Sequence, residues 1–398
     1  MKNQIHFRDC SYTQFCEEIA VLDLHDKSGD FKVRQKLKPY FEKLNDQRLE
    51  RFDEFCTLMY KFLVTEAETS FDVWYDKYVK LRRPLEDYLY LPRDSSYEKN
   101  VFNGSKYNWA SRLPKYLNYT EFYNTKKYDH QDSQYVAGLM KALFEKFHLR
   151  NSMVCPAFFD KIIRSSSVEE MWEIFMFGAN TASIFNPHTY YSILTHHFSG
   201  EMLFAPVMGW NAYHIGFHNS SFKYLLTTDV IPSVVNNTKK LNEFYERNTL
   251  IPHEKKVDAY CCPSESLLEN LPAHYRTSFD GVLFSPPYYN LEIYDSDQQS
   301  FSNYSDYSDW LESYWYETLR LCYYLMKPKA KLGFVISNYH GNDTFCDDMS
   351  DVASKFFQEE EISYIEWSSI KRSREARKTR DGNFEKLYLF SRGRNVGR

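Results

Sequence analysis

The chain has 398 residues, of which 43% are hydrophobic and 26% are charged, and its formal net charge is −5. Such a chain is expected to be globular with two or three domains rather than disordered. Its charge does not by itself indicate a nucleic-acid binder. It has no signal core and no apolar run long enough to span a bilayer, so we expect a soluble, cytoplasmic protein without a membrane partner. The 8 cysteines lack paired CxxC spacing, which predicts reduced thiols and no metal site.

The first part of the chain, residues 1–150, shows apolar residues at helical spacing over 41–62 and again over 133–149. We therefore expect a mostly helical N-terminal domain. Between these segments, residues 74–116 interleave basic and aromatic side chains, which suits contact with phosphates and unpaired bases. The alternative is an exposed helical face beside ordinary core aromatics. Because no linker is visible, the boundary with a second domain, residues 151–398, is placed near residue 150.

The second domain alternates short apolar segments with stretches of helical length, including a helix expected over residues 309–326. This alternation predicts an α/β fold with a parallel, doubly wound sheet. The strands we expect from apolar runs are 224–228, 257–262, 281–284, 332–338, 362–367 and 384–390.

The strand over 281–284 ends in Ser285-Pro286-Pro287-Tyr288. It is apolar throughout, as in a central strand buried on both faces. The two prolines end it, because neither can donate to a β-ladder. A hydroxyl, backbone carbonyls and an aromatic ring are thus placed at the carboxyl end of a strand, where ligands bind in open α/β sheets. The alternative is a plain proline turn after a strand.

The Ser-Pro-Pro-Tyr stretch is followed by a helix with Trp310-Leu311, by Leu325-Met326-Lys327-Pro328, and by an apolar strand. This combination resembles the DNA amino-methyltransferases, which move a methyl group from S-adenosylmethionine (SAM) to the exocyclic amine of a nucleobase. The Ser form of the motif resembles the N4-cytosine enzymes most closely, and the Asp form is commoner in N6-adenine enzymes. The resemblance covers about residues 185–390. It implies a Rossmann-like methyltransferase sheet, SAM as the cofactor, and DNA, more than RNA, as the partner.

The resemblance implies catalytic roles for Ser285, Pro286, Pro287 and Tyr288. An amine on an aromatic ring is a poor nucleophile, so the protein mainly positions and polarises it. The Ser285 hydroxyl and the Pro286 carbonyl would accept hydrogen bonds from the amine. Tyr288 would stack on a base extruded from the duplex, and Asn290 would contact its edge.

The resemblance also implies a cofactor site before the motif. Phe185 begins the segment that helps to hold the methionine end of SAM. The family's cofactor loop usually reads Asp-Pro, two residues, then Gly-Ser-Gly. This chain keeps Pro206 and Gly209, but it has Ala205 for the acid and Asn211 for the second glycine. Asn is the residue that best tolerates the backbone region that glycine favours, so we expect the turn to persist.

Two further segments are expected to complete this cofactor site. Asp229 ends the strand over 224–228 and lies 20 residues after Gly209, the spacing at which an acid binds ribose hydroxyls. A helix N-cap is the alternative for Asp229, and both roles can hold together. Ser264 or Glu265 would accept a hydrogen bond from the adenine amine, with a helix cap as the alternative.

The last two expected strands flank a strongly basic stretch over residues 371–380. This resembles the loop of the family's final hairpin, which borders the active site, and suits phosphate contact. A solvated charge run is the alternative. The expected nucleic-acid contacts here are Lys371, Arg372, Arg374, Arg377, Lys378 and Arg380. Only 8 residues follow residue 390, so we expect target recognition in residues 1–150, in the polar loop 291–308, or in both.

Three alternatives to an N4-cytosine enzyme stay open. Pocket shape can override the Ser form of the motif and give N6-adenine methylation. An RNA base N-methyltransferase is a second alternative. The third is a degenerate subunit that binds nucleic acid without methylating it, which the departures at Ala205 and Asn211 favour. The sequence leaves open a restriction-modification or other subunit partner and the oligomeric state.

Overall fold

The computed structural model describes residues 81, 83–93, 97–118, 126–127, 183–248, 255–293, 299–339, 342–366 and 385–393. The chain divides into two compact units, Met1–Lys80 with Asp129–Thr181, and Leu81–Tyr128 with Ala182–Arg398. All described residues belong to the second unit. The helices expected over 41–62 and 133–149 and the basic stretch 371–380 lie outside the described residues.

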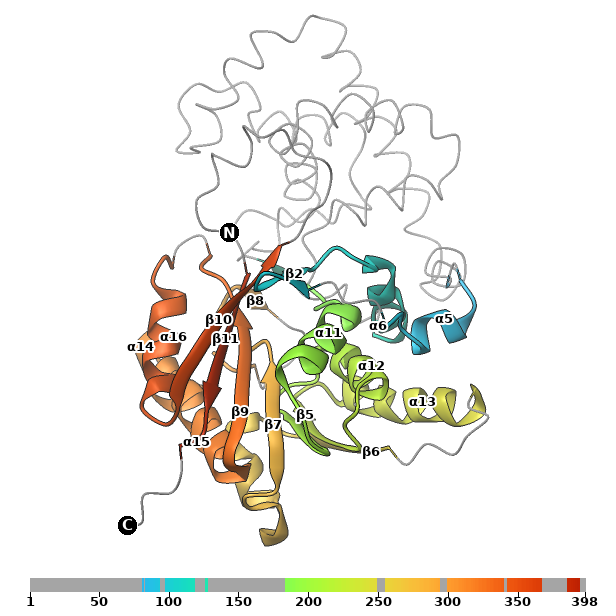
Figure 1. Cartoon of the computed structure of the whole chain (residues 1–398). Coiled ribbons are helices and arrows are strands. Elements are labelled where there is room, and N and C mark those ends of the chain that lie inside the picture. The colour runs from blue at the N-terminus through green and yellow to red at the C-terminus, as the bar shows by residue number, and fades with distance from the viewer. Residues whose placement is uncertain are drawn as a thin grey trace, which may run out of the picture. The chain divides into compact units, whose positions relative to one another are not determined.

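The second unit is built on a sheet of nine strands in the order β1-β2-β10-β11-β9-β7-β4-β5-β6 (Figure 1). Strands β6, β5, β4, β7 and β9 are parallel, and β11 runs antiparallel to both of its neighbours. The chain starts the parallel part at β4, winds outward to β6, and then returns to add β7 and β9 on the other side of β4. This is the doubly wound order of a Rossmann-like sheet. The strands are β1 (Tyr97–Glu98), β2 (Val101–Asn103), β4 (Met202–Ala205), β5 (Tyr224–Asp229), β6 (Lys256–Cys261), β7 (Phe279–Phe284), β9 (Met326–Ile336), β10 (Gln358–Glu366) and β11 (Glu385–Ser391).

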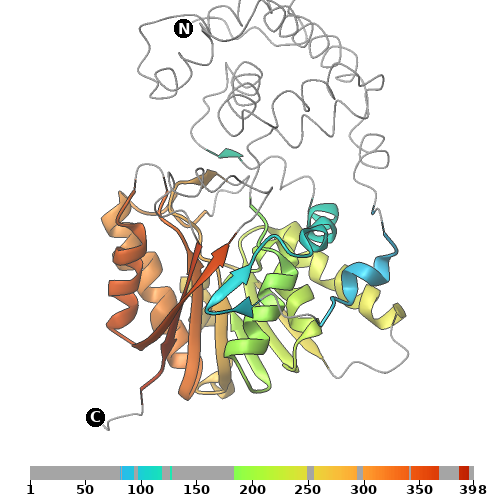
Figure 2. The same cartoon turned by 45° about the horizontal axis from the view of Figure 1, so that its top comes forward.

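Helices lie on either side of this sheet. In Figures 1 and 2, α11, α12 and α13 form one group and α14, α15 and α16 form the other. The predicted α/β fold with a Rossmann-like, doubly wound sheet is therefore confirmed for this part of the chain. Among the described residues, no helix has the length and apolarity needed to cross a bilayer. The helices are α5 (Leu85–Leu89), α6 (Arg112–Leu117), α11 (Pro187–His197), α12 (Ala212–Asn219), α13 (Pro232–Asn248), α14 (Tyr307–Trp310), α15 (Tyr316–Leu325) and α16 (Phe345–Ser354).

Short segments complete the unit. A separate two-stranded ladder joins β3 and β8 in antiparallel register. The helix expected over 309–326 is interrupted, because a π-helical turn separates α14 from α15. These segments are β3 (Lys126–Lys127), β8 (Glu292–Ile293), the π-helical η7 (Leu311–Trp315), and the 3₁₀ turns η2 (Asn108–Ser111), η4 (Gly209–Asn211), η5 (Ser264–Asn270) and η6 (Ala273–Tyr275).

The core lies on both faces of the central strands. In β7 every side chain except that of Asp280 is buried, from Phe279 to Phe284. Helices cover both faces, so the strand has no polar face to present to water, and its sequence is a continuous apolar run. Trp310 and Trp315 are the largest of the fully buried side chains and pack in the same core.

The predicted domain boundary near residue 150 needs a correction. Strand β2 pairs in parallel with β10, with Val101 opposite Tyr364 and Phe102 opposite Ile365. Phe102 is fully buried in the main core. Residues 97–103 therefore belong to the sheet rather than to a separate N-terminal domain. Strands of two and three residues are too short to show the alternation that marks a strand in sequence.

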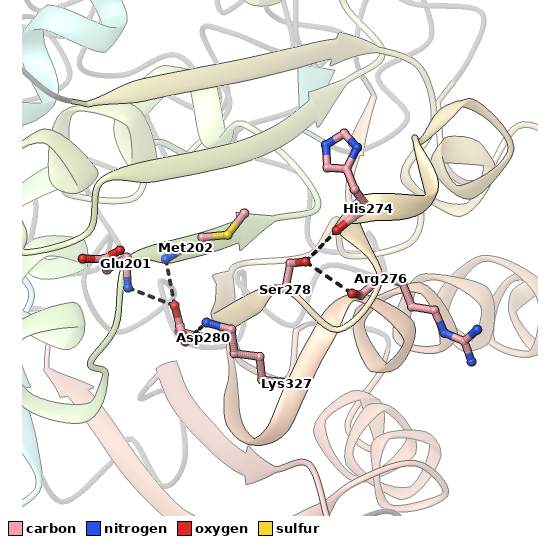
Figure 3. Close-up of polar contacts among 7 residues, drawn as sticks. All are labelled: Glu201, Met202, His274, Arg276, Ser278, Asp280 and Lys327. Carbon is pink, nitrogen blue, oxygen red and sulfur yellow. Dashed lines mark hydrogen bonds and ion pairs between the residues drawn. The ribbon is translucent and has the colours of Figure 1, made fainter.

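Hydrogen bonds and an ion pair of Asp280 fix the amino ends of three neighbouring strands (Figure 3). Asp280 of β7 accepts hydrogen bonds from the backbone N–H groups of Glu201 (2.9 Å) and Met202 (3.0 Å), and pairs with Lys327 of β9 (2.6 Å). Gly200 has a φ of 131°, and a Cβ there would lie 2.2 Å from the Asp280 Cβ. Because these contacts fix β4, β7 and β9 at one end, they also align the carboxyl ends of the strands, where the candidate site lies.

Candidate active site

The candidate site lies at the carboxyl edge of the parallel strands. Neighbouring strands β4 and β7 pair through Phe204 and Val282, and β5 pairs with β6 through Asp229 and Cys261. Because parallel strands end at the same edge of a sheet, the segments after β4, β5, β6 and β7 meet there. The structure therefore brings the predicted cofactor segments to the same edge as the Ser-Pro-Pro-Tyr motif, which follows β7.

The loop after β4, residues 206–211, makes a tight left-handed turn. Buried Ala205 ends the strand. Gly209, Trp210 and Asn211 then have φ values of 53°, 58° and 65°. A Cβ on Gly209 would lie 2.5 Å from Cζ of Tyr213. The backbone conformation favours glycine at this position, and the ring beneath it leaves no room for a Cβ. Asn211, which stands where the family has its second glycine, adopts the same left-handed conformation.

The Asn211 side chain is buried and directed into the protein. Its Nδ2 donates to the Val234 carbonyl (3.1 Å), and its Oδ1 accepts from Nδ2 of Asn118 (3.0 Å). At the carboxyl edge of the sheet Asn211 therefore contributes its backbone conformation and not its side chain. The departure from glycine leaves the shape of the turn in place.

Asp229 ends β5 beside this loop. Its Oδ1 accepts a hydrogen bond from the Ile231 N–H (3.0 Å). Burial raises the pKa of the Asp229 carboxyl to about 6, although the backbone N–H groups of Ile231, Val230 and Met208 act to lower it. The contact with Met208 places the carboxylate against the cofactor loop. Asp229 therefore ends its strand with a local turn and also faces the loop, so its two predicted roles are compatible.

The two candidates after β6 face different neighbours. Buried Ser264 has its Oγ 3.0 Å from Oγ1 of Thr318 in α15. Glu265 accepts a hydrogen bond from the Tyr304 hydroxyl (3.1 Å), and burial raises the pKa of its carboxyl. Of the two side chains, Glu265 is therefore the better candidate for a ligand contact.

In the motif, Ser285 is held by two hydrogen bonds. Its N–H donates to the Tyr213 hydroxyl oxygen (2.9 Å), and its own hydroxyl donates to the Val335 carbonyl of β9 (2.9 Å). A serine hydroxyl has one proton and two lone pairs. Because the proton is engaged with Val335, Oγ can only accept a hydrogen bond from a further partner. Pro286 is buried and Pro287 is partly buried.

The ring of Tyr288 is fixed beside the motif. Its hydroxyl oxygen accepts from the Ser337 N–H (3.0 Å), and its ring centre lies 5.2 Å from that of Phe345 and 6.1 Å from that of Tyr339. Burial raises the pKa of the Tyr288 hydroxyl well above its ordinary value. These contacts fix the ring plane, as a stacking platform requires. Asn290 is exposed in the turn that follows.

Two tyrosines that the sequence did not reveal as site residues connect the motif to the cofactor loop. Tyr213 of α12 and Tyr190 of α11 are buried and stacked, with ring centres 4.5 Å apart. Tyr190 donates its hydroxyl proton to the Leu283 carbonyl of β7 (2.9 Å), while Tyr213 accepts from Ser285 and supports Gly209. Phe185, a predicted cofactor residue, packs edge-on to Tyr213 at 6.2 Å. Helical spacing from Gly209 could have placed Tyr213 below the loop, but nothing in the sequence marks its hydroxyl.

The predicted nucleic-acid contacts over residues 371–380 lie outside the described residues, so they stay predictions. Within the described ranges, no group of three or more His, Cys, Asp or Glu side chains is arranged to hold a metal ion.

No family model matches the chain, and no curated protein matches it. Among solved structures, TrmN from Thermus thermophilus aligns with 52% of this chain and 48% of its own, at 10% identity and a TM-score of 0.35. The N-methyltransferase NodS from Bradyrhizobium japonicum WM9 aligns over 52% of this chain and 94% of its own (11% identity, TM-score 0.32). A methyltransferase from Pyrococcus furiosus aligns over 52% and 83% (14% identity, TM-score 0.33). Similarity at this level does not define the fold, which rests on the strand order and directions given above.

Proposed function

We propose that this chain transfers a methyl group from SAM to an exocyclic amine of a nucleobase. The observation that carries the proposal is the state of Ser285, whose hydroxyl proton is engaged with Val335 so that Oγ is left as an acceptor. It stands at the carboxyl end of β7, the strand beside β4. The left-handed turn at Gly209 follows β4, and Tyr213 contacts both places.

The residues at this edge fit the proposed cofactor. The backbone of the turn at Gly209 has no side chain in the way of a close approach. The Asp229 carboxylate would accept hydrogen bonds from the ribose hydroxyls, and Glu265 would accept one from the adenine amine. When bound, SAM supplies a methyl group on a positively charged sulfur, which is already a strong electrophile.

The chain's own contribution would then be to position and polarise the amine. Its lone pair is delocalised into the aromatic ring, so the free amine is a weak nucleophile. Oγ of Ser285 and the carbonyl of Pro286 would accept hydrogen bonds from the two N–H groups of the amine and direct its lone pair toward the methyl group. Tyr288, with its plane fixed by Ser337 and Phe345, would stack on the extruded base.

We favour DNA as the substrate and cytosine N4 as the acceptor, because the Ser form of the motif resembles the N4-cytosine enzymes. The basic residues over 371–380 would contact phosphates, and Asn290 would contact the base. The alternatives are methylation of adenine N6, methylation of an RNA base, and a binding subunit without activity. A restriction-modification partner fits the favoured function, methylation of cytosine N4 in DNA.

Nucleoside mass spectrometry with labelled SAM tests the proposal on unmethylated DNA and, separately, on RNA. The chain offers a matched pair of serines, one at each end of β7. Ser285→Ala removes the proposed acceptor. Ser278→Ala removes a hydroxyl that donates to the His274 carbonyl (2.8 Å) at the far end of the strand (Figure 3). We expect N4-methylcytosine with the native chain and with Ser278→Ala, and its loss with Ser285→Ala.

Other outcomes separate the alternatives. N6-methyladenine would keep the mechanism and change the base, and label in RNA alone would overturn the substrate. No transfer to either polymer, together with no SAM binding by calorimetry, would identify a binding subunit and refute the proposed activity.

A further inference from the structure

The cofactor loop has a backbone that its sequence alone does not favour. Trp210 and Asn211 both follow Gly209 in the left-handed region, with φ 58° and ψ 34° for Trp210 and φ 65° and ψ 8° for Asn211. A bulky residue such as Trp is rarely found there, because its Cβ approaches the following carbonyl. Such a conformation persists only where the surrounding structure holds it in place.

A network of three buried asparagines surrounds this turn. Asn118, Asn211 and Asn237 are 0%, 1% and 3% exposed. Nδ2 of Asn118 lies 3.0 Å from the Trp210 carbonyl oxygen, 3.0 Å from Oδ1 of Asn211 and 2.9 Å from the Pro114 carbonyl oxygen. Its two protons are therefore divided among three acceptors, two of which belong to the loop. Nδ2 of Asn211 in turn donates to the Val234 carbonyl of α13 (3.1 Å). Acceptors on both strained residues therefore lie within hydrogen-bond distance of one side chain, that of Asn118.

Asn237 sets the orientation of Asn118. Its Nδ2 donates to Oδ1 of Asn118 (2.9 Å) and to the Leu117 carbonyl (2.7 Å). With Oδ1 occupied as an acceptor, the Asn118 amide directs its donors at the loop. A side-chain amide can accept from Asn237 through its oxygen and donate to the loop through its NH₂ group at the same time. A buried network of this kind is strong when every member is satisfied and costly when one is missing.

We propose that Asn118 is a positioning residue for the cofactor loop, and that the segment 81–118 is thereby a structural part of the cofactor site. The inference rests on the proposed function for the identity of the cofactor. It goes beyond that function, because Asn118 lies outside the part of the chain that resembles methyltransferases and touches no proposed cofactor residue except Asn211. The loop departs from glycine at position 211, and Asn118 supplies the partner that the replacement asparagine needs.

Asn219 provides a matched control. It lies at the other end of α12 and also binds the segment 81–118: its Nδ2 donates to the Leu89 carbonyl (2.9 Å) and its Oδ1 accepts from the Leu91 N–H (2.8 Å). Asn219→Ala should therefore weaken the packing of this segment without touching the cofactor loop. Asn118→Ala and the isosteric Asn118→Asp remove the donors at the loop.

The experiment compares full-length chains carrying these three substitutions. The first measurement is hydrogen–deuterium exchange at the loop, where the Asn211 N–H donates to the Met208 carbonyl (3.1 Å). The second is SAM binding by calorimetry. We expect both Asn118 variants to exchange at least about tenfold faster at this amide and to bind SAM at least about tenfold more weakly, a change of about 1.4 kcal/mol. Asn219→Ala should leave both quantities within about twofold of the native chain.

The inference is overturned if the Asn118 variants match the native chain, or if Asn219→Ala changes the loop as much as they do. A native chain that binds no SAM would refute the proposed cofactor, and the exchange comparison would still decide the role of Asn118. If Asn118→Ala fails to fold, Asn118→Asp keeps the volume of the side chain and gives the same comparison.

Discussion

Replacing Gly209 by alanine tests the geometry of the cofactor loop most directly. The residue has a φ of 53°, and an added Cβ would lie 2.5 to 2.8 Å from three ring atoms of Tyr213. The left-handed backbone costs an alanine about 1–2 kcal/mol, and overpacking a buried site costs about 1–3 kcal/mol. The ring cannot withdraw easily, because it is stacked on Tyr190 and its hydroxyl holds the Ser285 N–H. We therefore expect Gly209→Ala to lower the free energy of unfolding by about 2–5 kcal/mol.

Denaturant unfolding followed by circular dichroism measures this loss, and Gly393→Ala is the matched control. A Cβ added at Gly393 would meet no heavy atom within 4 Å, and the residue has no left-handed φ, so its substitution should change the free energy by less than about 0.5 kcal/mol. Gly209→Ala should also abolish methyl transfer, because any shift of Tyr213 moves Ser285. If Gly209→Ala is as stable as Gly393→Ala and methylates at the native rate, the left-handed turn and its contact with Tyr213 are refuted.

Two further predictions concern the groups around this loop. Tyr213→Phe leaves the Ser285 N–H without its acceptor, which costs about 1–3 kcal/mol. In steady-state kinetics kcat should therefore fall about tenfold or more, while SAM binding stays within about twofold of the native chain. Tyr190→Phe should lower kcat less, and equal effects of the two substitutions would contradict the role of Tyr213. Asp229 has its pKa raised to about 6 by burial, so the folded chain holds this proton over a pH range in which the unfolded chain has lost it, and stability falls as pH rises from about 4 to about 6. Asp229→Asn should remove this pH-dependent loss of stability, which is worth up to about 3 kcal/mol. It should also weaken SAM binding above about pH 6, because the ionised carboxylate accepts hydrogen bonds from the ribose hydroxyls. The raised pKa is contradicted if the variant and the native chain differ in unfolding free energy by the same amount at pH 4 and at pH 7.5.

The sequence predicted the strands of the second domain where short apolar runs mark them. The strand expected over 224–228 is Tyr224–Asp229, and that expected over 257–262 is Lys256–Cys261. It failed where a strand departs from that pattern. Strand β9 begins at Met326 rather than near 332, because its first residues, which include Pro328, fall where the register between β7 and β9 shifts.

The order of strands and motifs predicted the carboxyl edge at which the described candidate residues of the cofactor segments and of the Ser-Pro-Pro-Tyr motif lie. It could not predict where their side chains point. Asn211 faces Asn118, and Ser264 faces Thr318, partners 93 and 54 residues away in the chain. The role of the Tyr213 hydroxyl could not be predicted for the same reason, because its partner Ser285 is 72 residues away. Such contacts depend on the packed fold, and no local pattern of residues specifies them.

The pairing of β2 with β10 has a consequence for how the chain acquires its structure. Val101 pairs with Tyr364, so this contact spans most of the unit's sequence and can form only once β10 has been made. Contacts of such high sequence separation are slow to form, and during synthesis Phe102 must stay outside its core until the C-terminal strands emerge. A fragment that begins at residue 151 would lack both β2 and Asn118. It should therefore expose apolar surface at the edge of β10 and aggregate, whereas a fragment that begins at Leu81 retains every strand of the sheet.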